Sequence, residues 1–169
     1  MKNNIILIGM MGAGKTTIGL ELSKKLTDFN LVDTDSEIEK SENMKISEIF
    51  EKFGEQYFRE LETKIIEKIC KNENQIISTG GGIFENEKNQ KILKENGRVI
   101  YLKATSEALF ERIKNQTHRP LLKQGFGKEN IKSILEKREI NYLKAHTIID
   151  TENKPIYNIV EEIINKKDL

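Results

Sequence analysis

The chain has 169 residues, of which 28 are basic and 27 acidic, so its formal net charge at pH 7 is only +1. This balance excludes a general electrostatic attraction to nucleic acid or to an anionic membrane surface. The single cysteine, Cys70, excludes an internal disulfide and is typical of a reducing compartment. The first apolar run, Ile5 to Gly9, is too short for a signal-peptide core or a membrane span. We therefore expect a cytoplasmic, monomeric protein whose residues 1–169 form one domain.

Short apolar runs alternate with longer amphipathic stretches along the whole chain. Apolar residues at helical spacing follow the first run, and Gly54 separates two such helices within residues 34–70. This alternation predicts an α/β three-layer sandwich around a parallel sheet, whose ligands bind beyond the carboxyl ends of the strands. The five runs show little polar alternation, as expected of parallel strands buried on both faces: Asn4–Gly9, Asn30–Asp33, Gln75–Thr79, Arg98–Lys103 and Thr147–Asp150.

A phosphate-binding loop follows the first run. The segment Gly9-Met10-Met11-Gly12-Ala13-Gly14-Lys15-Thr16 fits the pattern G-x-x-x-x-G-K-[ST], and it stands between a predicted strand and a predicted helix. Glycines allow the chain to reverse around a phosphate, and the loop N–H groups and the helix N-terminus then face the anion. Lys15 would reach the β- and γ-phosphates, and the Thr16 hydroxyl would bind Mg²⁺.

Two carboxylates follow the second run, in Asp33-Thr34-Asp35. On an extended segment alternate residues point to opposite sides, which predicts different roles for Asp33 and Asp35. One could hold a water on Mg²⁺, and the other could accept a proton from an alcohol. The alternative is a helix cap, because the segment precedes a predicted helix start. The position at a strand end beside a phosphate loop favours the functional interpretation.

Three glycines follow the third run, in Ser78-Thr79-Gly80-Gly81-Gly82. Residues that lack a Cβ at the carboxyl end of a strand let bare backbone N–H groups meet a ligand directly. A flexible loop before the next helix is the alternative. The position at the ligand-binding edge of the sheet favours a binding segment.

Arginine is rare in this chain, which has 23 lysines and five arginines. A planar guanidinium is therefore expected where an ammonium will not serve. Arg59 lies off the apolar stripe of its helix, with Glu62 one turn on to brace it. Arg138 lies on an apolar stripe, where a charge needs an anionic partner. Arg119 stands before Pro120 and glycines typical of a mobile flap, and Arg112 precedes that flap.

Together these motifs resemble the shikimate kinase family, whose members phosphorylate the 3-hydroxyl of shikimate. The resemblance covers nearly the whole chain, and its motifs occur in the family's order. They are Gly9 to Thr16, Asp33-x-Asp35, Gly54-Glu55-x-x-Phe58-Arg59-x-x-Glu62, Gly80-Gly81-Gly82, Arg119-Pro120-Leu121-Leu122 and Arg138-x-x-x-Tyr142.

The resemblance implies a five-stranded phosphate-loop NTPase fold of strand order 2-3-1-4-5, substrate-binding helices at about 34–70 and a lid at about 114–127. It implies that Asp35, Lys15 and Arg119 are catalytic and that Asp35, Arg59, Gly80, Gly81, Gly82 and Arg138 bind shikimate. ATP would be bound by Gly12, Ala13, Gly14, Lys15, Thr16, Thr17, Arg112 and Arg119. One Mg²⁺ would be bound directly by Thr16, with Asp33 and Ser78 in its outer shell.

Three alternatives remain. A kinase for another small hydroxy acid such as gluconate would keep the arginine pair. A nucleotide-binding switch is suggested by Asn165-Lys166-Lys167-Asp168, although this segment follows a helical stretch and no D-x-x-G occurs. A phosphate-loop protein without catalytic activity is the third. The aspartate pair and the glycine triplet favour shikimate phosphorylation within aromatic amino acid biosynthesis.

Overall fold

The computed structural model describes residues 2–114 and 127–166, and its centre is a parallel sheet of five strands. The strand order is β2-β3-β1-β4-β5, which confirms the fold class expected from the sequence. The first and third strands are slightly shorter than the apolar runs that predicted them. The strands are β1 (Ile5–Ile8), β2 (Asn30–Asp33), β3 (Gln75–Ser78), β4 (Arg98–Lys103) and β5 (Thr147–Asp150).

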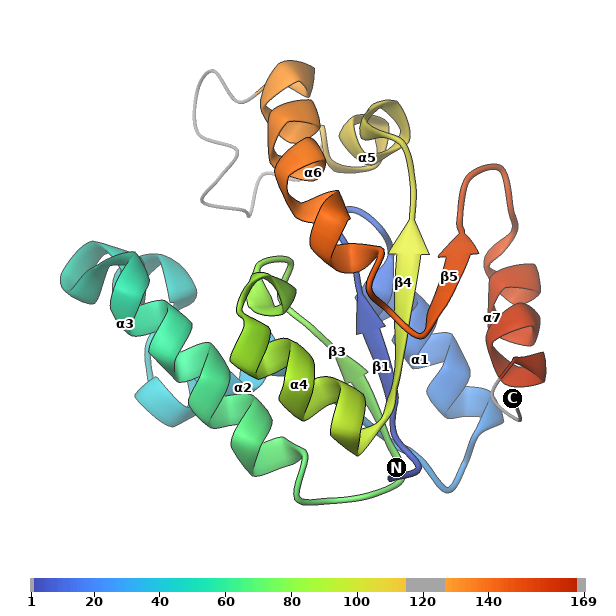
Figure 1. Cartoon of the computed structure of the whole chain (residues 1–169), viewed down its shortest axis with the longest axis horizontal. Helices are drawn as coiled ribbons and strands as arrows, with labels where there is room; N and C mark the ends of the chain where they lie inside the picture. The colour runs from blue at the N-terminus through green and yellow to red at the C-terminus, as the bar shows by residue number, and fades with distance from the viewer. Residues whose placement is uncertain (1, 115–126, 167–169) are drawn as a thin grey trace.

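Helices cover both faces of the sheet (Figure 1). On one face α1 (Lys15–Lys25) packs against α7 (Ile156–Asn165), and on the other α3 (Ile46–Ile69) packs against α4 (Glu87–Asn96). The pair α5 (Ser106–Ile113) and α6 (Lys128–Tyr142) extends beyond the end of β4. Two short elements, α2 (Thr34–Glu42) and the 3₁₀ turn η1 (Ile83–Glu85), follow β2 and β3. None of the helices in the described ranges is long and apolar enough to cross a membrane.

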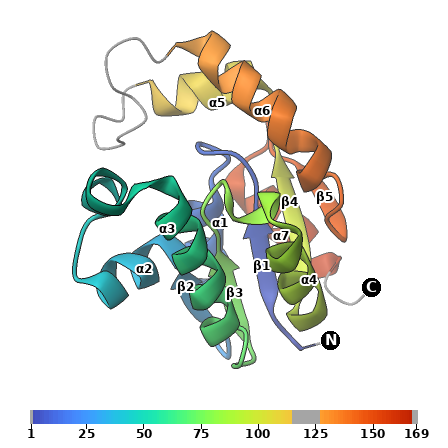
Figure 2. The same cartoon turned by 60° about the vertical axis from the view of Figure 1, so that its left-hand side comes forward.

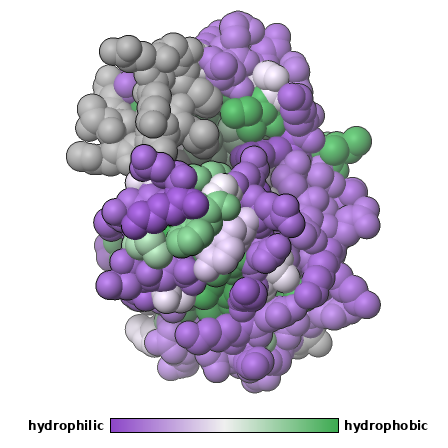
Figure 3. Space-filling view, turned by 90° about the vertical axis from the view of Figure 1, so that its left-hand side faces the viewer, coloured by the Kyte–Doolittle hydropathy of each residue, from purple (hydrophilic) through white to green (hydrophobic). Residues whose placement is uncertain are grey.

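The helix α3 changes direction at Gly54. This residue has φ 80° and ψ 178°, values that a helix does not contain and that a residue with a Cβ rarely adopts. The sequence predicted two helices separated at this residue. Two apolar side chains before the break, Phe50 and Phe53, are 37% and 50% exposed. Figure 3 shows hydrophobic surface among hydrophilic side chains on the side of the molecule where α3 lies.

Burial differs between the interior and the edges of the sheet. The interior strands β1 and β3 are buried throughout, as their uninterrupted apolar sequence predicted. The edge strands β2 and β5 are not, and Ile148 in β5 is 42% exposed. An edge strand has a neighbour on one side only, so an apolar sequence alone does not ensure its burial.

Asn4 ties three strands together at the end of the sheet opposite the phosphate loop. It is buried, and its Oδ1 accepts a hydrogen bond from the backbone N–H of Gln75 at 2.9 Å. Its Nδ2 donates to the carbonyls of Asn72 at 3.1 Å and Asn96 at 2.9 Å. One side chain therefore satisfies the buried N–H of Gln75 and, through partly buried hydrogen bonds, two carbonyls next to β3 and β4.

We expect Asn4→Ala to lower the free energy of unfolding by about 3 kcal/mol, because a buried N–H and two carbonyls lose their partner. Urea denaturation measures this value. The matched control is Asn3→Ala, which removes an exposed amide and is expected to cost less than about 0.5 kcal/mol. Equal losses for the two variants would contradict the role given to Asn4.

Candidate active site

The polar segments singled out in the sequence meet at the carboxyl ends of β1, β2 and β3. In the sheet register, Ser78 is paired with both Leu7 of β1 and Asp33 of β2. The phosphate loop, the aspartate pair and the glycine triplet therefore begin at one level of the sheet. Parallel strands in this order place their following loops side by side.

The phosphate loop takes backbone conformations that require glycine. Gly9, Gly12 and Gly14 have φ of 142°, 81° and 88°. Space is limiting as well, because a Cβ on Gly9 would lie 2.8 Å from the carbonyl oxygen of Leu102. The Lys15 ammonium lies over the loop and donates to the carbonyls of Gly9 at 2.8 Å and Met10 at 3.0 Å. A cation and the N-terminus of α1 are thus brought together at one loop, the arrangement that binds phosphate groups.

Thr16, Asp33 and Ser78 converge beside this loop. The Thr16 hydroxyl lies 3.3 Å from Asp33 Oδ2 and 3.4 Å from Ser78 Oγ. The other carboxylate oxygen of Asp33 accepts from the backbone N–H groups of Asp35 and Ser36 and caps α2. The capping and functional interpretations of Asp33 are therefore compatible, since each uses a different oxygen.

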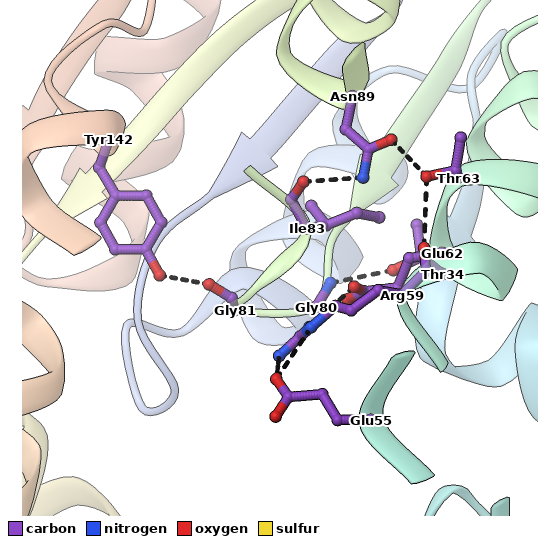
Figure 4. Close-up of polar contacts among 10 residues, drawn as sticks. All are labelled: Thr34, Glu55, Arg59, Glu62, Thr63, Gly80, Gly81, Ile83, Asn89 and Tyr142. Atoms are coloured by element: carbon purple, nitrogen blue, oxygen red, sulfur yellow. Dashed lines mark hydrogen bonds and ion pairs between the residues drawn. The ribbon is translucent and has the colours of Figure 1, made fainter. Parts of the chain in front are cut away.

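Asp35 lies in the first turn of α2 and not on an extended segment. The prediction that Asp33 and Asp35 lie on one extended segment and point to opposite sides of it is therefore wrong. Helix geometry separates them instead and turns Asp35 toward the glycine triplet. A Cβ on Gly80 would lie 2.6 Å from Asp35 Oδ1, so only glycine permits this approach. Gly80 is also bound by Thr34, whose hydroxyl accepts a hydrogen bond from the Gly80 N–H at 2.9 Å (Figure 4).

Arg59 on α3 is held by two glutamates (Figure 4). Its Nη1 donates to Glu62 Oε2 at 2.7 Å, and its Nη2 donates to Glu55 Oε1 at 2.9 Å. The side chain of Glu62 is only 2% exposed, whereas that of Glu55 is 67% exposed. Burial raises the pKa of Glu62, and the positive charge of Arg59 opposes that rise. The Arg59 guanidinium also fills the space that a Cβ on Gly82 would need, with Nη1 at 2.4 Å.

Arg138 on α6 reaches the same glycine triplet from the other side. Its Nη1 lies 3.4 Å from the place of a Cβ on Gly81, and it contacts Met10 Sδ of the phosphate loop at 4.0 Å. The sequence indicated that a charge on this apolar stripe needs an anionic partner. Arg138 is half-buried, and its positive charge opposes the rise in the pKa of Glu62.

Arg112 on α5 connects the phosphate loop with the segment after β5. It donates to the hydroxyl of Thr151 at 3.1 Å and to its carbonyl at 2.9 Å, and it lies 3.5 Å from the carbonyl of Gly12. Thr17 is exposed on the first turn of α1. Arg119 lies outside the described residues, as does nearly all of the predicted lid at 114–127.

Sequence reasoning missed Thr34 and Asn89. Thr34 is the central residue of the aspartate motif, and its position before a predicted helix was the signal that its hydroxyl would be available for a backbone group. Asn89 on α4 accepts from the Thr63 hydroxyl at 2.8 Å and donates to the carbonyl of Ile83 at 3.0 Å. No sequence pattern predicts this pair of hydrogen bonds, because they join α3, α4 and η1, which only the fold brings together.

The strand order and the loop after β1 define the class of protein as a phosphate-loop kinase. The family model for shikimate kinase matches residues 11–167. A curated shikimate kinase of Persephonella marina is 46% identical over 163 residues, which are 96% of this chain and 98% of the relative. One of Caldicellulosiruptor bescii is 48% identical over 149 residues, covering 88% of this chain and 86% of the relative. The chain therefore belongs to the shikimate kinase family, and it is an ATP-dependent kinase that phosphorylates shikimate in aromatic amino acid biosynthesis.

Solved structures agree with this assignment. A shikimate kinase from Acinetobacter baumannii in complex with shikimate has a TM-score of 0.91 and 33% identity, and the match covers 98% of this chain and 93% of that one. The shikimate kinase of Aquifex aeolicus has a TM-score of 0.84 and 38% identity, with 98% and 96% covered. A gluconokinase from Sinorhizobium meliloti is 15% identical, with a TM-score of 0.63 over 99% of this chain and 92% of that one, and shares the fold alone.

We expect Glu62→Gln to raise the KM for shikimate about fivefold or more, because a buried partner that loses its charge no longer fixes the Arg59 guanidinium. Steady-state kinetics with varied shikimate measures the effect. Glu55→Gln is the matched control, and its exposed ion pair is expected to change KM by less than about twofold. A larger effect from Glu55→Gln would show that the exposed glutamate orients Arg59.

Proposed function

We propose that this site transfers the γ-phosphoryl group of ATP to the 3-hydroxyl of shikimate, with Asp35 as the group that receives the hydroxyl proton. The observation that carries the proposal is the convergence of the phosphate loop, one carboxylate and two guanidinium groups on a single glycine triplet. Binding sites for phosphate groups, for an alcohol and for a further anion therefore lie next to one another. Phosphoryl transfer depends on such alignment and on neutralising charge more than on covalent chemistry.

The anion is the shikimate carboxylate, which Arg59 and Arg138 would bind from two sides. Guanidinium groups bind carboxylates through paired hydrogen bonds, so two arginines fix the orientation of the acceptor as well as its affinity. Gly80, Gly81 and Gly82 would pack against the same molecule, because their bare backbone leaves room beside the two side chains. The carboxylate lies at one end of shikimate, and its binding would direct the 3-hydroxyl toward Asp35.

The phosphates of ATP would lie in the loop formed by Gly12, Ala13, Gly14, Lys15, Thr16 and Thr17. Lys15 is already in place at this loop, and its ammonium would move from backbone carbonyls to phosphate oxygens. Arg112 would lie against the adenine, close to the segment after β5 that it contacts. Arg119 would supply a further positive charge to the transferring phosphoryl group from a lid at about 114–127, whose closure would exclude water.

The oxygen cluster of Thr16, Asp33 and Ser78 fits Mg²⁺. This ion takes only one or two protein oxygens when it is bound together with substrate phosphates and water. Groups of three or more His, Cys, Asp or Glu that could hold a metal do not occur among the described residues, and such a group is not needed here. Thr16 would bind the ion directly, with Asp33 and Ser78 holding its water ligands. The ion would neutralise charge on the β- and γ-phosphates.

Further parts of the proposal concern the state of the protein in the cell. We propose a cytoplasmic monomer with no nucleic acid or membrane partner. The near-zero net charge supports the absence of polyanionic partners. The site residues described above all come from one chain, so a second copy is not needed to complete them.

The test of the proposed function is ATP consumption in the presence of Mg²⁺, with shikimate, gluconate, AMP or no acceptor. Stimulation by shikimate alone is expected. Stimulation by gluconate or AMP instead would keep the phosphate machinery and overturn the placement of the acceptor. An identical rate without any acceptor would overturn the assignment of Asp35 and the two arginines to an acceptor site.

We expect Arg59→Lys and Arg138→Lys each to raise the KM for shikimate about tenfold or more while the KM for ATP changes little. A lysine ammonium keeps the charge but cannot form the paired hydrogen bonds of a guanidinium. Initial-rate kinetics with each substrate varied in turn measures both constants. Normal shikimate kinetics in both variants would refute carboxylate binding by these arginines.

We expect Asp35→Asn to lower kcat by about 10²-fold or more, the usual consequence of losing a positioned proton acceptor. Single-turnover phosphoryl transfer at saturating substrates measures the chemical step. Asp33→Asn is the comparison, since it is expected to increase the Mg²⁺ concentration needed for half-maximal rate. A decrease of less than about threefold for Asp35→Asn would make Asp35 a structural residue of α2.

A further inference from the structure

The glycine segment, defined here as residues 80–83, is anchored through its backbone by side chains from other elements (Figure 4). The Gly80 N–H donates to Thr34, and the Ile83 carbonyl accepts from Asn89 at 3.0 Å. Between these two anchors the Gly81 carbonyl accepts a hydrogen bond from the Tyr142 hydroxyl. The proposed function gives the segment its place against shikimate, but it does not use Tyr142.

Tyr142 ends α6, one helical turn after Arg138. Residues four apart share a face of a helix, and both side chains reach Gly81. Tyr142 is 1% exposed, and burial raises the pKa of its hydroxyl to about 12, so the group keeps its proton and donates at neutral pH. The same turn of α6 therefore holds the glycine segment with one side chain and approaches the phosphate loop with the other.

A run of three glycines has more backbone freedom to lose than any other tripeptide. Without an anchor at its centre, the segment would sample conformations in which its N–H groups face away from the acceptor. Tyr142 is buried and Gly81 is half-buried, so a Gly81 carbonyl that lost this partner would be only partly compensated by water. This contact joins the last turn of α6 to the backbone of Gly81 itself, whereas the neighbouring Asn141 reaches only Glu85 of η1.

We propose that Tyr142 is a positioning residue for the acceptor site: its hydroxyl fixes Gly81 and thereby places Arg138 where the shikimate carboxylate binds. This inference rests on the proposed placement of shikimate against Arg138 and the glycine segment. Tyr142 touches neither substrate in this account. Its effect is transmitted through the Gly81 carbonyl and through the last turn of α6.

Tyr142→Phe tests the inference, and Tyr101→Phe is its matched control. Tyr101 is also 1% exposed, and its ring packs on that of Tyr142 with centroids 5.0 Å apart. Its hydroxyl lies 3.5 Å from Glu139 and not at the glycine segment. We expect Tyr142→Phe to raise the KM for shikimate about fivefold and the KM for ATP less than about twofold. We expect Tyr101→Phe to change both constants less than about twofold.

Hydrogen exchange of the peptide that contains residues 80–83 gives a readout besides activity. Exchange is expected to be faster in Tyr142→Phe and unchanged in Tyr101→Phe. An unchanged shikimate KM in Tyr142→Phe would overturn the inference, as would an equal rise for both substrates or for both variants.

Arg138→Lys is measured alongside. If it leaves the shikimate KM unchanged, the placement of the carboxylate and this inference fail together. If it raises KM and Tyr142→Phe does not, only this inference fails.

Two unnatural residues keep the test decisive if the phenylalanine variant does not fold. At position 142, 4-fluorophenylalanine fills the space of the hydroxyl without donating, and 4-aminophenylalanine restores a donor. We expect a raised shikimate KM with the first and recovery toward the original value with the second. The absence of recovery would show that Tyr142 acts through packing and would overturn the inference.

Discussion

The close approach of side chains to bare backbone at Gly80, Gly81 and Gly82 is the constraint on which the site depends. A Cβ on Gly80 would lie 2.6 Å from Asp35 Oδ1 and one on Gly82 would lie 2.4 Å from Arg59 Nη1, both too close, whereas one on Gly81 would only contact Arg138 Nη1 at 3.4 Å. Asp35 and Arg59 can approach the segment this closely because Gly80 and Gly82 have no side chain. The order of the sheet supplies the rest, since β3 lies between β2 and β1 and brings the triplet beside the phosphate loop.

The positively charged side chains of this site are held in place by contacts within the protein before an anionic substrate binds. The buried Glu62 neutralises part of the charge of Arg59. Burial raises the pKa of Glu62, and the positive charges of Arg59 and Arg138 oppose that rise. Phosphate contacts and acceptor contacts come from different elements, the phosphate loop and α1 on one side and α3 and α6 on the other. Arg138 links them, because it touches both Met10 and the glycine triplet.

The sequence predicted the sheet and the phosphate loop well, because apolar runs between glycine-rich turns report directly on buried parallel strands. The sequence predicted the burial of the edge strands less well. Ile148 of β5 is as apolar as the interior residues, but its strand has no second neighbouring strand to cover it. The conformation at Asp35 was missed because strand alternation was extended two residues past the end of β2, into α2. The relay from Thr63 through Asn89 to Ile83 has no local signature, since each of its members depends on the packing of separate elements.

We propose that Arg59 and Arg138 bind a carboxylate and so orient the acceptor toward Asp35. Calorimetric titration of the protein with shikimate and with its methyl ester tests this claim most directly, because the ester keeps the ring and hydroxyls but loses the negative charge. We expect the ester to bind about tenfold more weakly or worse, because charge-assisted hydrogen bonds are lost. Equal affinities for the acid and the ester would contradict it.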